Sequence, residues 1–223
     1  MQKIKDNINN EDVDLVLIAG DIFDNSYDAV DDIDKIIKNF RDINSKYGTY
    51  AVFGNHDVDE RLFAGMSIDN NKKARRDKRM EEVLEKSNIE IIDDETVLLD
   101  DAFYLIGRKD YKKAGDCTNN RKNLNYLLDD VDKKKPIILL EHEPIYIDKI
   151  SKSGVDIHLS GYTHVGQFFP MTLLTRNKWK NQYGYIKENN MHSIVTSGVG
   201  LYGPNIRTSS DSEICILNIS FKE

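Results

Sequence analysis

Alternating apolar and polar stretches in the first quarter of the chain predict a strand, a helix and a second strand. The run DLVLIAGD, residues 14–21, is short and apolar and is ended by Gly and Asp, which is typical of a buried parallel strand. Apolar side chains recur at helical spacing through residues 28–48, where Gly48 suits a helix C-cap. The run TYAVFGN, residues 49–55, predicts a second strand. Such a strand–helix–strand crossover is the unit of a parallel sheet.

The remainder of the chain predicts further strands and helices of the same kind. In chain order these are residues 70–88 (a charged loop running into a helix), 89–108 (two or three strands with tight turns), 120–132 (a helix), 135–144 and 155–164 (one strand each) and 191–221 (strands around a Gly-rich loop). The predicted fold class is therefore α/β. We expect a single domain that covers residues 1–223, because this length is enough for one sizeable core.

Polar residues of the metal-binding type follow four of the predicted strands. They are Asp21, then Asn55 with His56 and Asp57, then His142, and finally His164. In open α/β sheets ligands bind beyond the carboxyl ends of the strands, so these loops are expected to meet in space. A carboxylate, a carboxamide and two imidazoles form a mixed oxygen and nitrogen set that suits divalent Mn, Fe, Zn or Co. Two such ions, roughly 3.5–4 Å apart, can clamp both oxygens of a phosphoryl transfer.

Composition and charge narrow the class of partner. Apolar residues make up 39% of the chain and charged residues 31%, which is ordinary for a globular protein. The formal net charge of −7 argues against general nucleic-acid binding but leaves a phosphoester substrate open, since a metal ion supplies local positive charge. Cys117 and Cys215 fit no metal-finger or redox spacing. No apolar run approaches the roughly 20 residues of a spanning helix, and the polar N-terminus is unlike a signal peptide.

Four motifs, in order, resemble those of the calcineurin-like metallophosphoesterases. They are GDIFD (20–24), GNHD (54–57), LEHEP (140–144) and GYTHVGQ (161–167). The resemblance spans residues 12–167, and the last motif is similar to one of a bacterial branch written GHTHxGQ. The resemblance implies a four-layer α/β/β/α sandwich of two mixed sheets. It also implies hydrolysis of a phosphomonoester or phosphodiester by a metal-bound hydroxide, and it points to envelope-linked phosphoesters as substrates.

The resemblance also implies a role for each motif residue. Asp21 would bridge two metal ions, Asn55 and His142 would bind the second ion, and His164 would bind the first. His56 would be a catalytic residue near the leaving group, assisting by proton donation or charge stabilisation, and Asp57 would orient His56.

Two departures from the family pattern predict an altered metal centre. The Asp-x-His motif of the family's first strand is absent, so we expect that strand to be missing and the chain to be a shortened version of a longer protein; a genuine short relative is the rival explanation. Tyr162 stands where the family has the first His of G-H-x-H. A phenol with a pKa near 10 is a poor ligand for a divalent ion at neutral pH, whereas ferric iron would accept a phenolate. We therefore expect this chain to bind fewer metal ions than an intact relative with two, or to bind them more weakly.

These departures keep a second class of function open, namely a degenerate metallophosphoesterase fold that acts as a binding or scaffold module. Membrane association is expected only through a segment that precedes this chain, and the localisation stays open. For Arg108 and Arg207 we weigh phosphate contact against a surface ion pair or a structural role. His158 is interpreted as a packed or surface residue. The basic run 72–79 is interpreted as solvated, with a patch facing anionic lipid or cell-wall polymer as the alternative.

Overall fold

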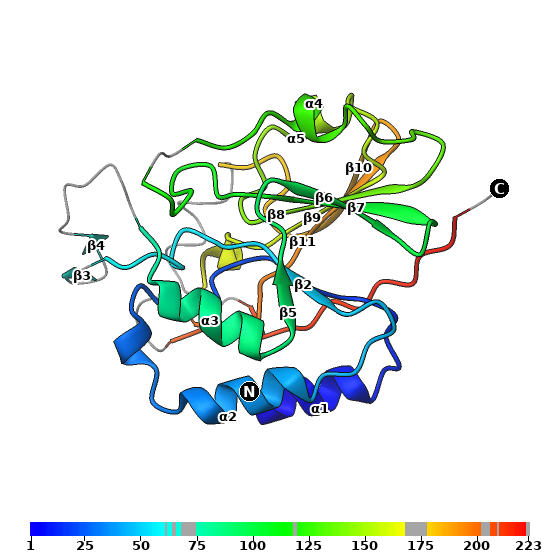
Figure 1. Ribbon diagram of the computed structural model, residues 1–223. Coiled ribbons are helices and arrows are strands. Elements are labelled where there is room, and N and C mark those ends of the chain that lie inside the picture. The colour runs from blue at the N-terminus through cyan, green and yellow to red at the C-terminus, as the bar shows by residue number, and fades with distance from the viewer. Residues whose placement is uncertain are drawn as a thin grey trace.

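Two β-sheets stacked face to face, with helices outside both, form the protein in a computed structural model (Figure 1). The structure describes residues 1–60, 62–63, 66–67, 75–117, 120–167, 178–201, 206–208 and 210–221. The helices are α1 (Gln2–Asn9), α2 (Ile33–Arg41), α3 (Lys78–Lys86), α4 (Leu124–Leu127) and α5 (Ile147–Ile150), with 3-10 turns η1 (Tyr27–Ala29) and η2 (His164–Gly166). The strands are β1 (Val16–Ile18), β2 (Thr49–Ala51), β3 (Leu62–Phe63), β4 (Met66–Ser67), β5 (Ile89–Ile91), β6 (Glu95–Leu99), β7 (Phe103–Arg108), β8 (Ile137–Glu141), β9 (Ile157–Ser160), β10 (Gly184–Glu188) and β11 (Met191–Val195).

The smaller of the two stacked sheets has the order β1-β2-β5 and is parallel throughout. The larger sheet has the order β10-β11-β9-β8-β7-β6, with parallel pairing from β7 to β11 and an antiparallel strand at each edge. Within both parallel parts the strands point the same way, so their carboxyl ends collect along one edge, as the sequence predicts. A separate two-stranded ribbon pairs β3 with β4.

Three buried apolar clusters define four layers. One cluster lies between the smaller sheet and helices α2 and α3, a second between the two sheets, and a third between the larger sheet and helices α4 and α5. Figure 1 shows α1, α2 and α3 on one side of the sheets and α4 and α5 on the other. The predicted α/β/β/α sandwich is confirmed, with mixed pairing in the larger sheet only.

Helix α2 is shorter than the apolar pattern suggests. Its first turn is capped by Asp32, whose carboxylate accepts a hydrogen bond from the Lys35 amide at 3.0 Å. The helix ends at Arg41, so the predicted C-cap at Gly48 is wrong. Gly48 instead has φ of +92° and its carbonyl accepts from Val16 N at 3.2 Å, which aligns the start of β2 beside β1. The positive φ of Gly48 therefore helps to align strand β2 and does not terminate helix α2.

The C-terminal tail differs from the strands predicted for residues 191–221. Strand β11 forms as expected, but the described residues 206–208 and 210–221 contain no strand. Ile216, Ile219 and Phe221 are 49%, 41% and 47% exposed. Strand propensity alone does not make a strand, because the backbone also needs a neighbouring strand to pair with. In the part of the chain that is described, no helix is long and apolar enough to span a bilayer.

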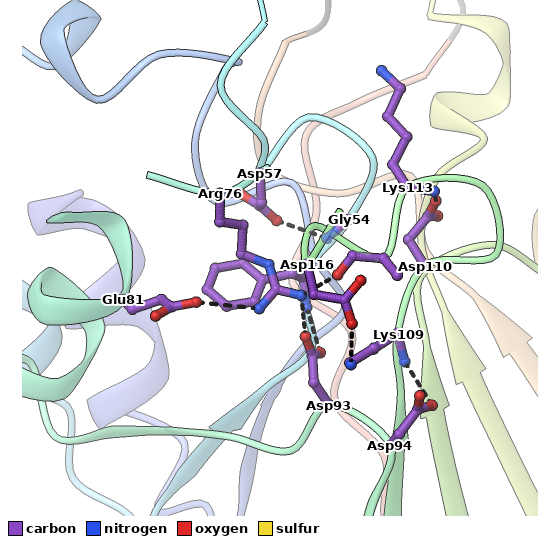
Figure 2. Close-up of polar contacts among 12 residues, drawn as sticks. Gly54, Asp57, Arg76, Glu81, Asp93, Asp94, Lys109, Asp110, Lys113 and Asp116 are labelled. Carbon is purple, nitrogen blue, oxygen red and sulfur yellow. Dashed lines mark hydrogen bonds and ion pairs between the residues drawn. The ribbon is translucent and has the colours of Figure 1, made fainter. Parts of the chain in front are cut away.

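Arg76 joins three segments near the carboxyl ends of the smaller sheet (Figure 2). Its guanidinium lies 4.0 Å from the ring centroid of Phe53, contacts the carboxylate of Asp93 and donates to the Ala114 carbonyl at 2.6 Å. Its side chain is only 11% exposed. The interpretation of residues 72–79 as a solvated run is therefore wrong for Arg76, whereas residues 72–74 lie outside the described residues.

Candidate metal centre

The loops after β1, β2 and β8 touch each other because two glycines allow close approach. A Cβ atom on Gly20 would lie 2.6 Å from Nδ1 of His142 and 2.7 Å from the Gly54 amide nitrogen. A Cβ atom on Gly54 would lie 2.7 Å from Cε1 of His142. Separations this short are excluded by van der Waals contact, so both motif glycines are required by their surroundings. Asp21, the next residue after Gly20, has φ of +54°, which turns its side chain out of the strand direction.

Three predicted ligand side chains converge at this point. Nε2 of His142 lies 3.1 Å from Oδ2 of Asp21 and 3.1 Å from Oδ1 of Asn55. On the other side of the ring, Nδ1 of His142 is 2.6 Å from the carbonyl oxygen of Ala19. A carbonyl accepts only, so Nδ1 carries the proton that it donates to Ala19. The hydrogen bond fixes the tautomer and aims Nε2 at the two oxygens, as in many metal-binding histidines.

This arrangement needs a positive charge at its centre. With Nδ1 protonated, a neutral His142 would direct the lone pair of Nε2 at two oxygen atoms that also carry lone pairs. Burial works to lower the pKa of His142, but the charge and hydrogen bond of Asp21 raise it to about 9. Burial likewise works to raise the pKa of Asp21, and His142 then lowers it to about 2. The proton on Nε2 of His142 therefore supplies positive charge at the position where a metal ion would bind.

The donor set fits a divalent metal ion, although it is small. One carboxylate oxygen, one carboxamide oxygen and one imidazole nitrogen are suitable ligands for Mn, Fe, Zn or Co. Within the described ranges, however, no three His, Cys, Asp or Glu side chains are grouped so that they could hold an ion. Structural and catalytic metal sites usually have three or four protein ligands. Asp21, Asn55 and His142 thus offer three of the donor atoms that a metal centre would need.

His164 follows β9 and begins the short turn η2. Burial lowers the pKa of its imidazole, while the charges of Asp21 and Arg207 act on it in opposite directions. The backbone carbonyl of His164 accepts a hydrogen bond from Oγ of Ser210 at 3.4 Å. The role of His164 as a ligand of the first metal stays a prediction.

Asp57 has a different place from the one that the family pattern implies. Its carboxylate is fully buried and accepts from the backbone amides of Asp21 at 2.8 Å, Phe23 at 2.7 Å and Gly54 at 2.7 Å. Burial and the charge of Asp21 raise its pKa to about 7. Asp57 therefore ties the loops after β1 and β2 together, and its oxygens bond to backbone amides and not to the ring of His56.

The ring of His56 is oriented by another residue. Its Nδ1 contacts Oδ1 of Asn25, and Asp24 lies 4.0 Å away. Burial lowers the pKa of His56, which favours a neutral ring. The backbone amide of His56 donates to Oδ1 of Asp21 at 2.9 Å, so the histidine lies next to the candidate metal position. The sequence contained no clear signal for Asn25, because an Asn near a motif has many structural uses.

The two arginines that were candidates for substrate contact are both engaged with the protein. Nη1 of Arg108 lies 3.2 Å from Oε2 of the buried Glu141, and Nη2 donates to the Lys122 carbonyl at 3.0 Å. Arg207 donates to the carbonyls of Asp211 at 2.9 Å and Ser197 at 3.2 Å. For Arg108 the structure favours the ion pair, although a buried one. Nη1 of Arg207 also donates to Oγ of Ser210 at 3.3 Å, and that hydroxyl donates to the His164 carbonyl at 3.4 Å.

Tyr162 packs against the candidate metal ligands. Its ring lies edge-to-face on His142, with 5.3 Å between centroids, and also contacts Trp179 at 5.5 Å. Nζ of Lys112 lies 5.8 Å from the Tyr162 centroid. Burial and the charge of Glu143 raise the pKa of the phenol, so it stays protonated at neutral pH. A protonated phenol is a hydrogen-bond donor and a poor metal ligand, and the weakening of a metal site by Tyr162 stays a prediction.

His158 is fully buried in the larger sheet and does not contact the candidate metal ligands. Its Nε2 lies 3.2 Å from Oε1 of Glu141, and its Nδ1 lies 3.0 Å from Oγ of Ser193. It is a packed histidine, as expected from its position within a strand.

Comparison with known proteins identifies a family for this chain. The family model described as calcineurin-like phosphoesterase matches residues 1–168. An uncharacterized metallophosphoesterase of Helicobacter pylori is 31% identical over 97% of this chain and 54% of its own length. A second one, from Campylobacter jejuni, is 29% identical over 100% of this chain and 55% of its own length. A transmembrane protein with metallophosphoesterase domain from Danio rerio is 29% identical over 100% of this chain and 49% of its own length.

The chain belongs to the calcineurin-like phosphoesterase family. It spans about half the length of these curated relatives. The activity and partners of the whole protein are therefore matters of proposal.

Proposed function

We propose that this chain carries the phosphoester-hydrolysing centre of a metal-dependent phosphoesterase, and that its residues hold divalent metal weakly. The supporting observation is the convergence of Asp21 Oδ2, Asn55 Oδ1 and His142 Nε2 around a point that requires positive charge. The substrate class is a phosphomonoester or phosphodiester, and the resemblance to the bacterial branch favours an envelope-linked one. Metal identity among Mn, Fe, Zn and Co is left to experiment.

Each residue has a defined task in this proposal. Asp21, Asn55 and His142 would hold the metal, which when bound supplies positive charge that polarises the phosphoryl group and lowers the pKa of water. The Ala19 carbonyl keeps His142 in the tautomer that presents Nε2. The contact with Asn25 holds Nδ1 of His56, so Nε2 is the ring nitrogen left to face the leaving oxygen, and it would donate a proton there from the doubly protonated ring. Asp57 keeps the two loops in register.

A second candidate function is a binding or scaffold module without turnover. It is favoured by Tyr162, which packs its ring on His142 at the position of a family ligand. It is also favoured by the small donor set within the described chain. The two candidates differ in one measurable property, namely turnover when metal is supplied.

Hydrolysis of an aryl phosphate with added Mn separates the two candidates. We expect slow turnover that depends on Mn, with fewer than two tightly held ions per chain by elemental analysis. We expect His142→Ala to lose turnover by roughly a hundredfold or more, because a metal ligand and its charge are removed. A folded chain that shows no turnover at any Mn concentration would favour the binding module, and two tightly held ions would contradict weak binding.

Replacing Tyr162 with histidine is expected to strengthen metal binding. A neutral imidazole offers a lone pair at about pH 7, whereas a phenol with a pKa near 10 must first lose a proton at a cost of roughly 4 kcal/mol. We expect Tyr162→His to bind Mn roughly tenfold tighter or better by calorimetry. The matched control is Tyr162→Phe, which keeps the ring and removes the hydroxyl; it should bind Mn as the parent does. Weaker binding in Tyr162→Phe would mean that the phenol is a working ligand.

A further inference from the structure

A cavity of about 620 Å³ is lined by the last residue of β7 and by residues of α4 and α5. Its charged and aromatic lining consists of Arg108, Arg121, Lys122, Lys149, Tyr111 and Tyr146. Asp21, Asn55, His142 and His164 are absent from its lining. The volume is within the range of roughly 300–1,000 Å³ that small-molecule sites occupy. The cavity is therefore distinct from the candidate metal centre and large enough for a small ligand.

The lining is strongly cationic in a chain whose formal net charge is −7. Four cationic side chains line the cavity, and no Asp or Glu of the described residues does. Nζ of Lys122 donates to the backbone carbonyl of Asp94 at 3.1 Å, and Nζ of Lys149 lies 5.0 Å from the centroid of the Tyr146 ring. Within the described ranges neither lysine has a carboxylate at ion-pair distance. Clefts lined by charge of one sign concentrate ions of the opposite sign.

The guanidinium groups of Arg108 and Arg121 are held in place by the buried carboxylate of Glu141. Nη1 of Arg108 and Nη1 of Arg121 lie 3.2 Å and 3.1 Å from the same oxygen of Glu141, and their side chains are only 10% and 6% exposed. Burial works to raise the pKa of Glu141, but the hydrogen bond from His158 and the two guanidiniums hold it below its usual value. Glu141 thus faces two guanidiniums, and the buried Asp94, which acts on Arg108 and accepts from the Lys122 amide at 2.8 Å, is the second carboxylate near the four cations, so positive charge stays in excess. Fixed donors of this kind lose little entropy when they bind an anion.

Two tyrosines form an aromatic wall at the mouth of the cavity. Their rings pack edge-to-face with 5.5 Å between centroids, and the hydroxyl of Tyr146 donates to that of Tyr111 at 2.9 Å. The guanidinium of Arg121 lies 5.4 Å from the Tyr111 centroid. Tyr111 and Tyr146 are nevertheless 45% and 48% exposed. Exposed aromatic rings held in a fixed arrangement next to cations suit a ligand that has both a flat apolar part and an anionic part.

We propose that this cavity binds a phosphate monoester carried on a ring, with the phosphate against Lys122 and Lys149 and the ring against Tyr111 and Tyr146. The excess charge of the Arg108–Arg121–Glu141 group favours a dianion over a monoanion. This proposal does not depend on the hydrolytic function, because the cavity shares no lining residue with the candidate metal centre.

The test is a titration of the full chain with phenyl phosphate in excess chelator, followed by amide NMR. Chelator removes metal, so the candidate metal centre neither hydrolyses the ligand nor binds it through an ion. We expect saturable shifts at residues around Lys122 and Lys149. The double variant Lys122→Gln, Lys149→Gln should bind roughly tenfold more weakly or worse, because two charge-assisted contacts are lost. Both lysines are exposed, so the fold should be retained.

Two controls separate the cavity from general charge effects. Lys134→Gln with Lys152→Gln makes the same change in net charge at exposed lysines outside the cavity and should leave affinity within about twofold. Tyr111→Leu should weaken phenyl phosphate but leave inorganic phosphate unchanged, because only the ring contact is lost.

Several results would overturn the proposal. They are equal losses in the two double variants, equal affinity for inorganic and phenyl phosphate, shifts confined to the loops of Asp21 and His142, or no saturation up to about 10 mM.

Discussion

Replacing Gly54 with alanine is expected to separate the candidate metal ligands. The new Cβ atom would lie 2.7 Å from the backbone nitrogen of Asp21 and 2.7 Å from Cε1 of His142, so at least one of these residues must move. We expect Mn affinity to fall roughly ten- to a hundredfold, because ligand orientation is lost while every ligand stays in the chain. We also expect the free energy of unfolding in chelator to fall by about 1–3 kcal/mol, the usual cost of overpacking. Calorimetry and urea denaturation measure the two effects.

Gly161→Ala is the matched control, since Gly161 begins the last motif as Gly54 begins the second. A Cβ atom on Gly161 would lie 3.6 Å from the Ala19 carbonyl oxygen and 3.7 Å from the Ala19 Cβ, which is ordinary contact. Its unfolding free energy should stay within about 1 kcal/mol of the parent, and its Mn affinity should be unchanged. If Gly161→Ala loses as much Mn affinity as Gly54→Ala, then close approach of the loops is not what Gly54 provides.

Among the proposed variants, Arg76→Ala is expected to lower the free energy of unfolding most. The change removes the guanidinium that contacts Asp93, Phe53 and the Ala114 carbonyl, and it leaves Asp93 with a side chain only 9% exposed. Removing one partner of a buried ion pair typically costs about 3–5 kcal/mol, because the remaining charge stays buried. Denaturation by urea, monitored by circular dichroism, would measure the loss.

Arg79→Ala is the control for Arg76 because it lies in the same basic run but is 47% exposed. Its ion pairs with Asp28 and Asp77 are at the surface, so we expect a loss of at most about 1 kcal/mol. The double variant Arg76→Met, Asp93→Asn should recover at least half of the loss seen in Arg76→Ala, since no uncompensated charge remains. Equal losses for Arg76→Ala and Arg79→Ala would show that the buried ion pair contributes no more to stability than the surface ion pairs do.

The apolar pattern was sufficient to predict the α/β class and the meeting of the motif loops, whereas the four layers were implied by the resemblance to the family. Apolar runs that end in polar residues identify buried parallel strands, and parallel strands end along one edge of a sheet. This pattern predicts that Asp21, Asn55, His142 and His164 lie together. The folded chain brings the side chains of Asp21 and Asn55 each to 3.1 Å from His142, and for His164 the prediction stays open. Tyr162 could likewise be recognised as an altered position from the motif pattern.

Only the tertiary structure decided what each residue of a motif contacts. Asp57 and His56 are neighbours in sequence, yet the carboxylate of Asp57 accepts from backbone amides of two loops and the ring of His56 contacts Asn25. Gly54 and Gly161 look alike in the motifs, but only Gly54 stands against other loops at less than van der Waals distance. Such differences depend on atoms far apart along the chain, and a local pattern carries no information about them.

Contacts between distant parts of the chain also explain why Arg76 is buried and why the described C-terminal tail contains no strand. The sequence correctly determined that residues 72–79 are basic and that residues 210–221 favour strands. Whether a cation is solvated depends on Phe53, Asp93 and Ala114, which other loops bring to it. Whether an apolar segment becomes a strand depends on a partner strand for its backbone hydrogen bonds, and the described tail has none. Local propensity thus indicated where helices and strands could form, and packing between distant segments determined which of them formed and which side chains meet at the site.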